Sequence, residues 1–277
     1  MRALPAGLLC CLAVLAAAEP ARADDQPFLT LYMTDIDSQG EREVEQWLGW
    51  KNGKTGASYN DFQSRTEFEY GITDNLQGSV YLNYERNSTR FGMPQSFDIE
   101  NSAGVSGELI WRLLDSDFDP VGFALYVEPS WNTDEREIES RILLQKNFLD
   151  DALRCAVNIA VEDDWDREED GWERDSTIGL DAGATYAVAP ELSAGVEFGN
   201  ERDFEGVLMG GAAREQASAF FLGPTIEYEP LPWKITVGAQ AQLPWATSPP
   251  GNAGAVLDGF EAQAERFRLA FRLSRDF

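Results

Sequence analysis

The sequence predicts an all-β fold: a transmembrane antiparallel up-and-down β-barrel of about twelve strands that follows a cleaved signal peptide. Three observations predict this class. Apolar and polar residues alternate with a period of two along most of the chain, short and long connections follow one another in turn, and the chain ends on an aromatic residue, Phe277. Beyond residue 24, no stretch approaches the ~18–20 consecutive apolar residues of a membrane-spanning helix.

The first 23 residues have the pattern of a secretory signal peptide. Arg2 supplies a positive start, residues 8–18 form an apolar run, and Ala21-Arg22-Ala23 gives the small-x-small pattern of a cleavage site. The mature chain is therefore expected to begin at Asp24. Cleavage removes two of the three cysteines, which leaves Cys155 and no intramolecular disulfide.

The mature chain is expected to divide into two parts. Residues 24–41 form an N-terminal periplasmic segment, in which residues 28–33 are compatible with either a short strand or an extended peptide ahead of the barrel. Residues 42–277 form the outer-membrane barrel itself. Its twelve expected strands span residues 42–50, 59–72, 76–85, 103–114, 121–131, 138–148, 152–162, 176–187, 191–200, 217–229, 233–243 and 264–277.

The connections between these strands alternate in length. Residues 73–75, 115–120, 149–151, 189–190 and 230–232 form short turns, whereas 86–102, 163–175, 201–216 and 244–263 form long loops. This alternation is typical of outer-membrane barrels, and an even number of strands leaves both termini on the short-turn, periplasmic side. Aromatic residues at the ends of strands, such as Trp50, Tyr70, Trp131 and Trp233, are expected to form belts at the two membrane interfaces.

Several segments resemble an uncharacterised proteobacterial family of outer-membrane β-barrels, whose members are often described as porins or transporters. They are residues 42–47 (REVEQW), 69–74 (EYGITD), 111–115 (WRLLD), 119–122 (DPVG), 125–129 (LYVEP) and 145–150 (QKNFLD). The resemblance implies a location in the bacterial outer membrane, contact with its lipid and lipopolysaccharide, and insertion by the barrel-assembly machinery through Phe277. It brings no functional residues with it.

Composition excludes several function classes. With 48 acidic against 22 basic residues the net charge is −26, which argues against nucleic acid as a partner because phosphate binding needs a basic face. The chain has no histidine, so Ser-His-Asp and Cys-His catalysis and histidine-ligated metals are excluded, and no cofactor is expected. Neighbouring acids such as Glu67 and Glu69 permit general acid–base chemistry, but a polar lumen wall explains them without an enzyme.

Charged residues on the polar faces of the strands are expected to line the lumen. These candidates are Arg65, Glu67, Glu69, Glu108, Arg112, Glu128, Arg141, Arg154, Lys234, Arg266, Arg268 and Arg272. They permit two interpretations: a salt-bridged polar core that fills a small barrel, and a charged pore that selects solutes by the sign of their charge. Arg266, Arg268 and Arg272 on the final strand are expected to form a cationic ladder beside acids of the first strand.

The acidic segment 163–173 holds seven acids and one base, and its Asp166-x-Glu168-x-Asp170-Gly171 motif partly resembles a calcium-binding loop. The twelfth position of that motif is Thr177, which cannot supply the bidentate carboxylate, so no metal site is expected. The sequence therefore favours a porin-like channel or transporter for small hydrophilic solutes. The alternatives are a structural or interaction barrel with a closed lumen, and an outer-membrane enzyme.

Overall fold

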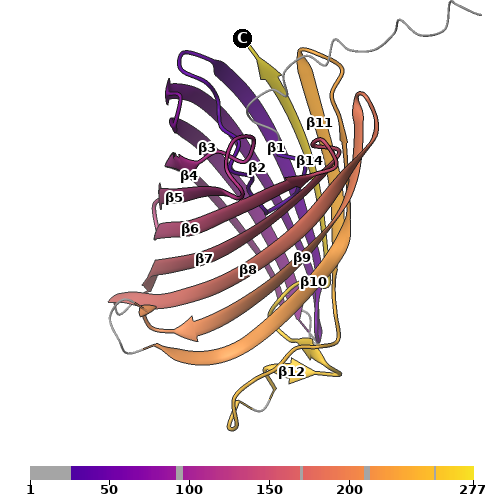
Figure 1. The fold of residues 1–277 in the computed structure, drawn as a ribbon. Helices are drawn as coiled ribbons and strands as arrows, with labels where there is room; N and C mark the ends of the chain where they lie inside the picture. The colour runs from indigo at the N-terminus through magenta and orange to yellow at the C-terminus, as the bar shows by residue number, and fades with distance from the viewer. Residues whose placement is uncertain (1–25, 92–95, 169–170, 209–212, 253) are drawn as a thin grey trace, which may run out of the picture.

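Twelve long strands form a closed antiparallel barrel in the computed structural model, which describes residues 26–91, 96–168, 171–208, 213–252 and 254–277. Each strand pairs with its neighbours along the chain, and β14 closes the barrel between β11 and β1 (Figure 1). Within the described residues no helix is long and apolar enough to cross a membrane. The expected signal peptide at residues 1–23 lies outside the described residues.

The barrel strands alternate in direction from the first to the last. They are β1 (Arg42–Lys54), β2 (Ala57–Thr73), β3 (Leu76–Phe91), β4 (Ser96–Leu114), β5 (Gly122–Trp131), β6 (Glu135–Phe148), β7 (Leu153–Glu168), β8 (Gly171–Ala189), β9 (Leu192–Glu205), β10 (Arg214–Tyr228), β11 (Trp233–Gln242) and β14 (Phe267–Asp276). A small hairpin of β12 (Val256–Leu257) and β13 (Phe260–Glu261) lies in the connection between β11 and β14.

All twelve predicted strands are confirmed, but three of the predicted long loops are wrong. Residues 86–102 and 163–175 belong mostly to paired strands; Arg86 pairs with Asn101, and Asp164 pairs with Asp175. The range 201–216 is too long at both ends, because residues 201–205 and 214–216 belong to β9 and β10. These hairpin ends lie beyond the part of the barrel that has an apolar outer face. Alternation therefore fades there although the backbone pairing continues, and the sequence pattern stops short of the true strand ends. The fourth predicted loop, 244–263, contains the small hairpin.

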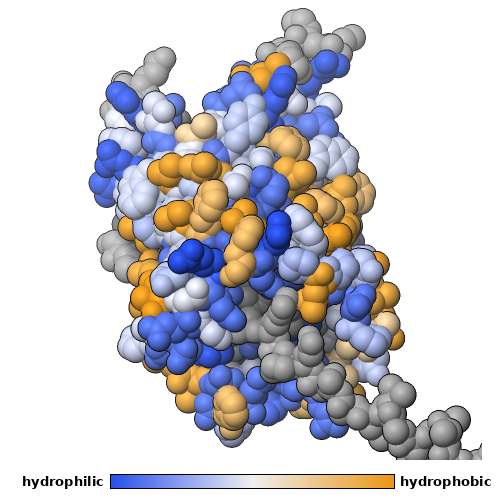
Figure 2. All heavy atoms as spheres, turned by 90° about the horizontal axis from the view of Figure 1, so that it is seen from above, coloured by the Kyte–Doolittle hydropathy of each residue, from blue (hydrophilic) through white to orange (hydrophobic). Residues whose placement is uncertain are grey.

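The two ends of the barrel differ. At one end, called here the short-turn end, lie the C-terminus and turns such as Asp74-Asn75; at the other, the far end, lie the β1–β2 turn and the β12–β13 hairpin (Figure 1). In outer-membrane barrels the short turns face the periplasm. Figure 2 looks onto the short-turn end, where hydrophilic and apolar residues are interspersed and apolar residues also lie along the flanks of the molecule.

The barrel has an apolar outer face and a polar inner face. On β3, Val80 and Leu82 point outward and are each 59% exposed, whereas Ser79 and Tyr81 are buried inside. Water would penalise such a continuous apolar outer face, but lipid does not, and a closed barrel leaves no strand edge unpaired in the membrane. This arrangement is the reverse of a soluble barrel, in which the apolar side chains fill the interior.

Cys155 lies on the outer face of β7, between the outward residues Leu153 and Val157. We therefore expect it to resist water-soluble thiol reagents in native membranes and to react after the membrane is dissolved in detergent. Labelling with a charged maleimide measures this, and a cysteine placed at the exposed turn residue Asp150 serves as the reactive control. Rapid labelling of Cys155 in intact membranes would show that the strand is shifted by one residue.

The expected periplasmic position of residues 24–41 needs correction. Residues 26–37, called here the N-terminal segment, lie inside the barrel, and Phe28, Met33 and Ile36 are 0% exposed. Residues 28–33 form no strand, and they bend at residues 28–30 inside the lumen instead of lying ahead of the barrel. The apolar side chains of the segment explain its position, because enclosure by the barrel removes them from water.

Candidate functional site

The N-terminal segment runs round the inner wall at the short-turn half of the lumen and binds one strand after another. Polar side chains on four strands accept hydrogen bonds from its backbone N–H groups: Glu197 on β9, Asn158 on β7, Gln145 on β6 and Gln77 on β3. The wall therefore recognises the peptide backbone through side chains, since its own backbone groups are already used in the barrel.

Glu197 makes the densest set of these contacts. Its carboxylate accepts the N–H groups of Leu29 at 2.8 Å, Thr30 at 2.9 Å and Leu31 at 3.0 Å, and also the Thr30 hydroxyl at 2.6 Å. The side chain is 1% exposed. Hydrogen bonds to an ionised acceptor are about twice as strong as neutral ones, so a single carboxylate holds three consecutive peptide units.

The wall carries small residues where the segment passes closest. A Cβ atom at Gly183 would lie 2.6 Å from the ring of Phe28, and one at Gly238 would lie 2.7 Å from the side chain of Leu29. A Cβ atom at Gly122 would lie 2.3 Å from Oγ1 of Thr34. These glycines create the space that the segment occupies.

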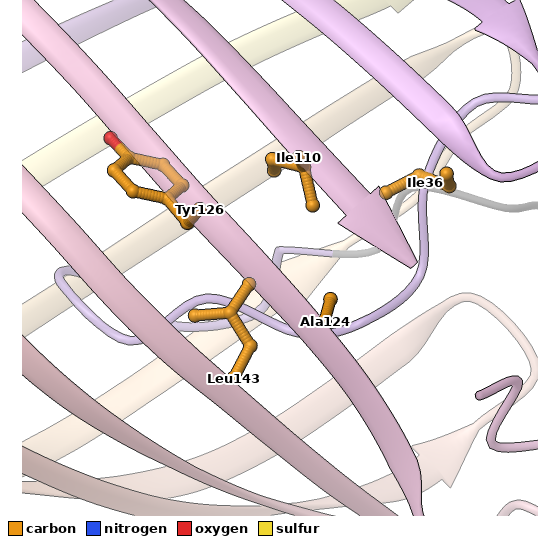
Figure 3. Packing of buried hydrophobic residues seen from close by; sticks show 5 residues of the cluster. All are labelled: Ile36, Ile110, Ala124, Tyr126 and Leu143. Carbon is orange, nitrogen blue, oxygen red and sulfur yellow. The ribbon is translucent and has the colours of Figure 1, made fainter. Parts of the chain in front are cut away.

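Two small apolar clusters fill the lumen between the segment and the wall. Phe28, Leu31 and Met33 pack against Ala156 of β7. Ile36 packs with four wall residues, Ile110, Ala124, Tyr126 and Leu143, as Figure 3 shows. These apolar wall residues lie in an otherwise polar lumen. They occur where the segment, and not water, covers the wall.

Beyond the segment, toward the far end, the lumen contains a cavity of about 580 Å³. Leu29, Thr30 and Tyr32 of the segment are among the residues that line it, and the wall residues range from Arg272 up to Lys51 and Glu135 near the rim. Twelve acidic and five basic residues line this cavity. Its surface is therefore strongly charged, with an excess of carboxylates.

The structure joins most of the predicted lumen residues in ion pairs across or along the wall. Arg65 reaches Glu128 at 2.6 Å, and Arg272 reaches Glu45 at 3.2 Å. The remaining contacts are Arg141–Glu139 at 2.6 Å, Arg154–Glu227 at 3.2 Å, Lys234–Glu43 at 2.8 Å, and Arg268 with both Glu201 at 2.6 Å and Glu265. Of the other predicted acids, Glu69 accepts a hydrogen bond from Gln77, Glu108 accepts one from Tyr81, and Glu67 is buried beside them.

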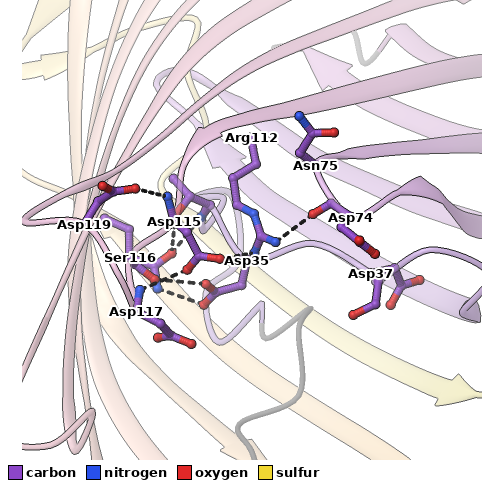
Figure 4. A network of polar contacts seen from close by, with 12 residues as sticks. Asp35, Asp37, Asp74, Asn75, Arg112, Asp115, Ser116, Asp117 and Asp119 are labelled. Atoms are coloured by element: carbon purple, nitrogen blue, oxygen red, sulfur yellow. Dashed lines mark hydrogen bonds and ion pairs between the residues drawn. The ribbon is translucent and has the colours of Figure 1, made fainter.

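Two predicted lumen residues lie at the rims instead of along the lumen wall. Arg112 lies at the short-turn end, where it donates to the carbonyl of Asp74 at 2.8 Å and lies 3.4 Å from Asp115 (Figure 4). Arg266 lies at the far end, where it donates to Thr55 at 2.8 Å and stacks 3.5 Å from the centroid of Phe260. Its N–H donates to the carbonyls of both Asn52 and Gly53, and β14 begins at the next residue, Phe267. The cationic ladder predicted on the final strand therefore reduces to Arg268 and Arg272.

Figure 4 also shows how the end of the segment is tied to the turns. Ser116, in the turn after β4, donates to Asp35 at 3.2 Å. The N–H of Asp37 donates to Gln77 at 2.6 Å, and burial together with the nearby Glu43 raises the pKa of the Asp37 carboxyl to about 7.

At the far end of the barrel, Glu265 is also buried. Burial favours the neutral form of Glu265, but Arg268 and Lys51 outweigh this effect and lower the pKa of its carboxyl to about 2.

Some carboxylates of the described residues lie close enough together to hold a cation. In the lumen wall, Glu137, Glu139 and Glu162 place one oxygen each within 4.8 Å of the others. Such groups occur in many proteins without a metal, and nothing further in the structure assigns an ion to them. Residues 169–170 of the calcium-like motif lie outside the described residues.

The contacts of the N-terminal segment are what sequence reasoning missed. Glu197, Asn158 and Gln145 are polar residues at inward positions, and in the sequence they do not differ from other polar residues of the lumen. The available signal was the run Phe28–Met33, whose apolar residues exceed what a solvated periplasmic peptide needs. A second signal was the series of small residues at the inward positions of β8, Thr177, Gly179, Gly183 and Thr185.

Comparison with solved structures finds outer-membrane barrels that share this fold. The chain is similar to a COG4313 outer membrane channel from Pseudomonas putida F1, with a TM-score of 0.59 and 12% identity over 88% of this chain and 98% of that one. It is also similar to the NanC porin, with a TM-score of 0.52 and 12% identity over 84% and 98% of the two chains. The KdgM porin gives a TM-score of 0.51 and 10% identity over 85% and 99%. Comparison with curated proteins finds no match.

The closed barrel with an apolar outer face, a charged lumen and these structural relatives defines an outer-membrane β-barrel protein, located in the bacterial outer membrane. A family model matches residues 20–271, nearly the whole chain. The protein belongs to that family, the family of unknown function DUF6662.

Proposed function

We propose that this barrel is a channel for small hydrophilic solutes, which enter its charged cavity from the far end. The observation that carries this proposal is the cavity of about 580 Å³ inside a closed membrane barrel. Cavities of roughly 300–1,000 Å³ accommodate small organic molecules. The charged wall favours solutes that can exchange their hydration for polar contacts.

The balance of charge favours cations over anions. Arg65, Arg141 and Arg268 in the cavity wall each contact a carboxylate, which neutralises much of their field. By contrast, Glu137 and Glu162 lie beside a third carboxylate. The five basic and twelve acidic lining residues thus leave a negative potential in the cavity, which concentrates cations and weakens at high salt.

A closed structural or interaction barrel is the second candidate, because the N-terminal segment fills the short-turn half of the lumen. An enzymatic role is not part of the proposal, since ion pairs and a polar lumen wall explain the lumen carboxylates without catalysis. We also propose that the barrel contacts lipopolysaccharide in the outer leaflet of the membrane. The exposed C-terminal Phe277 is the residue that the barrel-assembly machinery would recognise.

Conductance in planar bilayers tests the channel. We expect currents whose reversal potential in a salt gradient indicates a preference for cations. The double substitution Glu137→Gln with Glu162→Gln should lower that preference several-fold at about pH 9, where these crowded carboxyls ionise more fully than at neutral pH. Glu191→Gln, at an exposed turn outside the lumen, is the matched control and should leave selectivity unchanged. If neither the wild-type protein nor a variant that lacks residues 26–36 carries current, the channel function is wrong and the structural role stands.

A further inference from the structure

We propose that the N-terminal segment is the gate of this channel: docked in the lumen it closes the path to the periplasm, and released it opens that path. This inference rests on the proposed channel function and adds its regulation. The lumen wall is then a binding track for an extended peptide, and the occupant of the track is the beginning of the same chain.

The position of the segment makes it a barrier. Its contacts run from Thr225 on β10, which donates to the carbonyl of Pro27, through Glu197, Asn158 and Gln145 to Gln77 on β3. It therefore passes most of the strands of the barrel at one level. The apolar side chains of Phe28, Leu31, Met33 and Ile36 pack against the wall and fill the space between it and the segment. The charged cavity stops at Leu29, Thr30 and Tyr32.

The kind of contact makes the barrier removable. The twelve barrel strands pair only with each other, and the N-terminal segment adds no strand to them. Glu197, Asn158, Gln145 and Gln77 hold the segment by side-chain groups, which can turn to water or to one another when the segment leaves. Release therefore breaks no pairing in the barrel wall.

The connection to the barrel permits movement of the segment. A tight turn at Gln39-Gly40 joins it to β1, with the N–H of Glu41 bonded to the carbonyl of Ser38. Gly40 has a φ of 91°, and a Cβ atom there would meet nothing within 4 Å. The N–H of Gly40 also donates to the carbonyl of Gly71 on β2 at 2.8 Å. The turn is thus an anchor at the rim of the lumen, and the segment ahead of it can move about this point.

Burial of the segment makes the closed state dominant at rest. Phe28, Leu31, Met33 and Ile36 are each almost fully buried. Release would expose these four apolar side chains to water, so release of the whole segment is rare without a driving force. The wild-type channel is therefore expected to be closed most of the time, with brief openings under applied voltage.

Two variants test the gate by opposite changes, both made with Cys155→Ser so that no native thiol interferes. The first lacks residues 26–36. The second carries Thr34→Cys and Gln145→Cys, whose two thiols are joined under oxidation by a short dithiol linker, since the side chains of Thr34 and Gln145 now meet at 2.9 Å. Heat-modifiable migration on gels first shows that each variant is a folded barrel.

We expect the deletion to raise the open probability at least tenfold over that of Cys155→Ser. The oxidised cysteine pair should abolish openings, and a reducing agent should restore them. The single variant Thr34→Cys, oxidised in the same way, should behave like Cys155→Ser. If the wild-type protein, the deletion and the oxidised pair all conduct equally, the segment is not the gate and the channel stands. If neither the wild-type protein nor the folded deletion carries current, both the gate and the channel are overturned. A wild-type current that the folded deletion abolishes would overturn the gate alone.

Discussion

Replacing Gly183 with leucine is expected to expel the N-terminal segment from the barrel. A Cβ atom at this position would lie 2.6 Å from the ring of Phe28 and 2.7 Å from Cδ2 of Leu31. Leucine adds three further carbon atoms in the same direction, so it takes the volume that these two buried side chains now fill. Overpacking of a tight contact usually costs about 1–3 kcal/mol, and here the segment can escape the clash by undocking.

The change is measured with a reporter cysteine in place of Met33, in the Cys155→Ser background. In the docked state Met33 is 0% exposed, so a charged maleimide should not reach it. With Gly183→Leu the reporter should be labelled nearly completely in the native barrel. Gly107→Leu is the matched control, because Gly107 lies on the outer face of β4 and its nearest contact would be 3.9 Å away. A reporter that stays protected in the Gly183→Leu variant would show that the lumen has room for both the new leucine side chain and the docked segment.

Replacing Arg268 with serine is expected to have the largest effect on the stability of the barrel. Its guanidinium group makes two bonds of 2.6 Å to Glu201, contacts Glu265, and stacks 3.5 Å from the centroid of the Phe221 ring. Serine leaves the buried Glu265 without this cation. Breaking a buried pair by removing one partner costs about 3–5 kcal/mol, and we expect the lower value because Glu201 is a third exposed.

The free energy of unfolding in urea, measured in lipid vesicles, tests this expectation. Arg214→Ser provides the control, since Arg214 pairs with Glu205 at the far end, where the side chains are 72% and 58% exposed. An exposed pair contributes about 0–1 kcal/mol, so that variant should remain close to the wild type. If the two substitutions lowered the free energy of unfolding equally, the charges of the lumen would be as well hydrated as those of the hairpin ends.

The strands of the barrel could be predicted because lipid and lumen act on opposite faces of each strand. In β2, residues 59–72 were predicted and Ala57–Thr73 are observed. Phe68 and Tyr70 must face lipid, whereas Glu67 and Glu69 must not, and this contrast produces a period of two that local sequence reveals. Where the hairpins pass beyond lipid, as at Asp164 and Asp175, the contrast disappears and the prediction stopped too early.

The inward direction of the charged residues could also be predicted, but not their partners. Arg65 lies on β2 and Glu128 lies on β5, three strands further round the barrel. The pair forms across the curve of the wall, and only the closed barrel sets which residues meet. Arg266 shows the converse limit. It keeps the alternation of the inward Arg268, but it lies at the far rim, where it contacts Thr55 and Phe260 instead of the lumen.

By itself, the sequence determined that this protein is a twelve-stranded outer-membrane barrel with a charged interior, because period-two alternation is a local property of each strand. Only the tertiary structure decided that residues 26–37 occupy that interior. The contact between Leu29 and Glu197 joins residues 168 positions apart, and neither residue differs in the sequence from others of its kind. Such a contact depends on the level and spacing of side chains round the closed wall, and these exist only after the last strand has paired with the first.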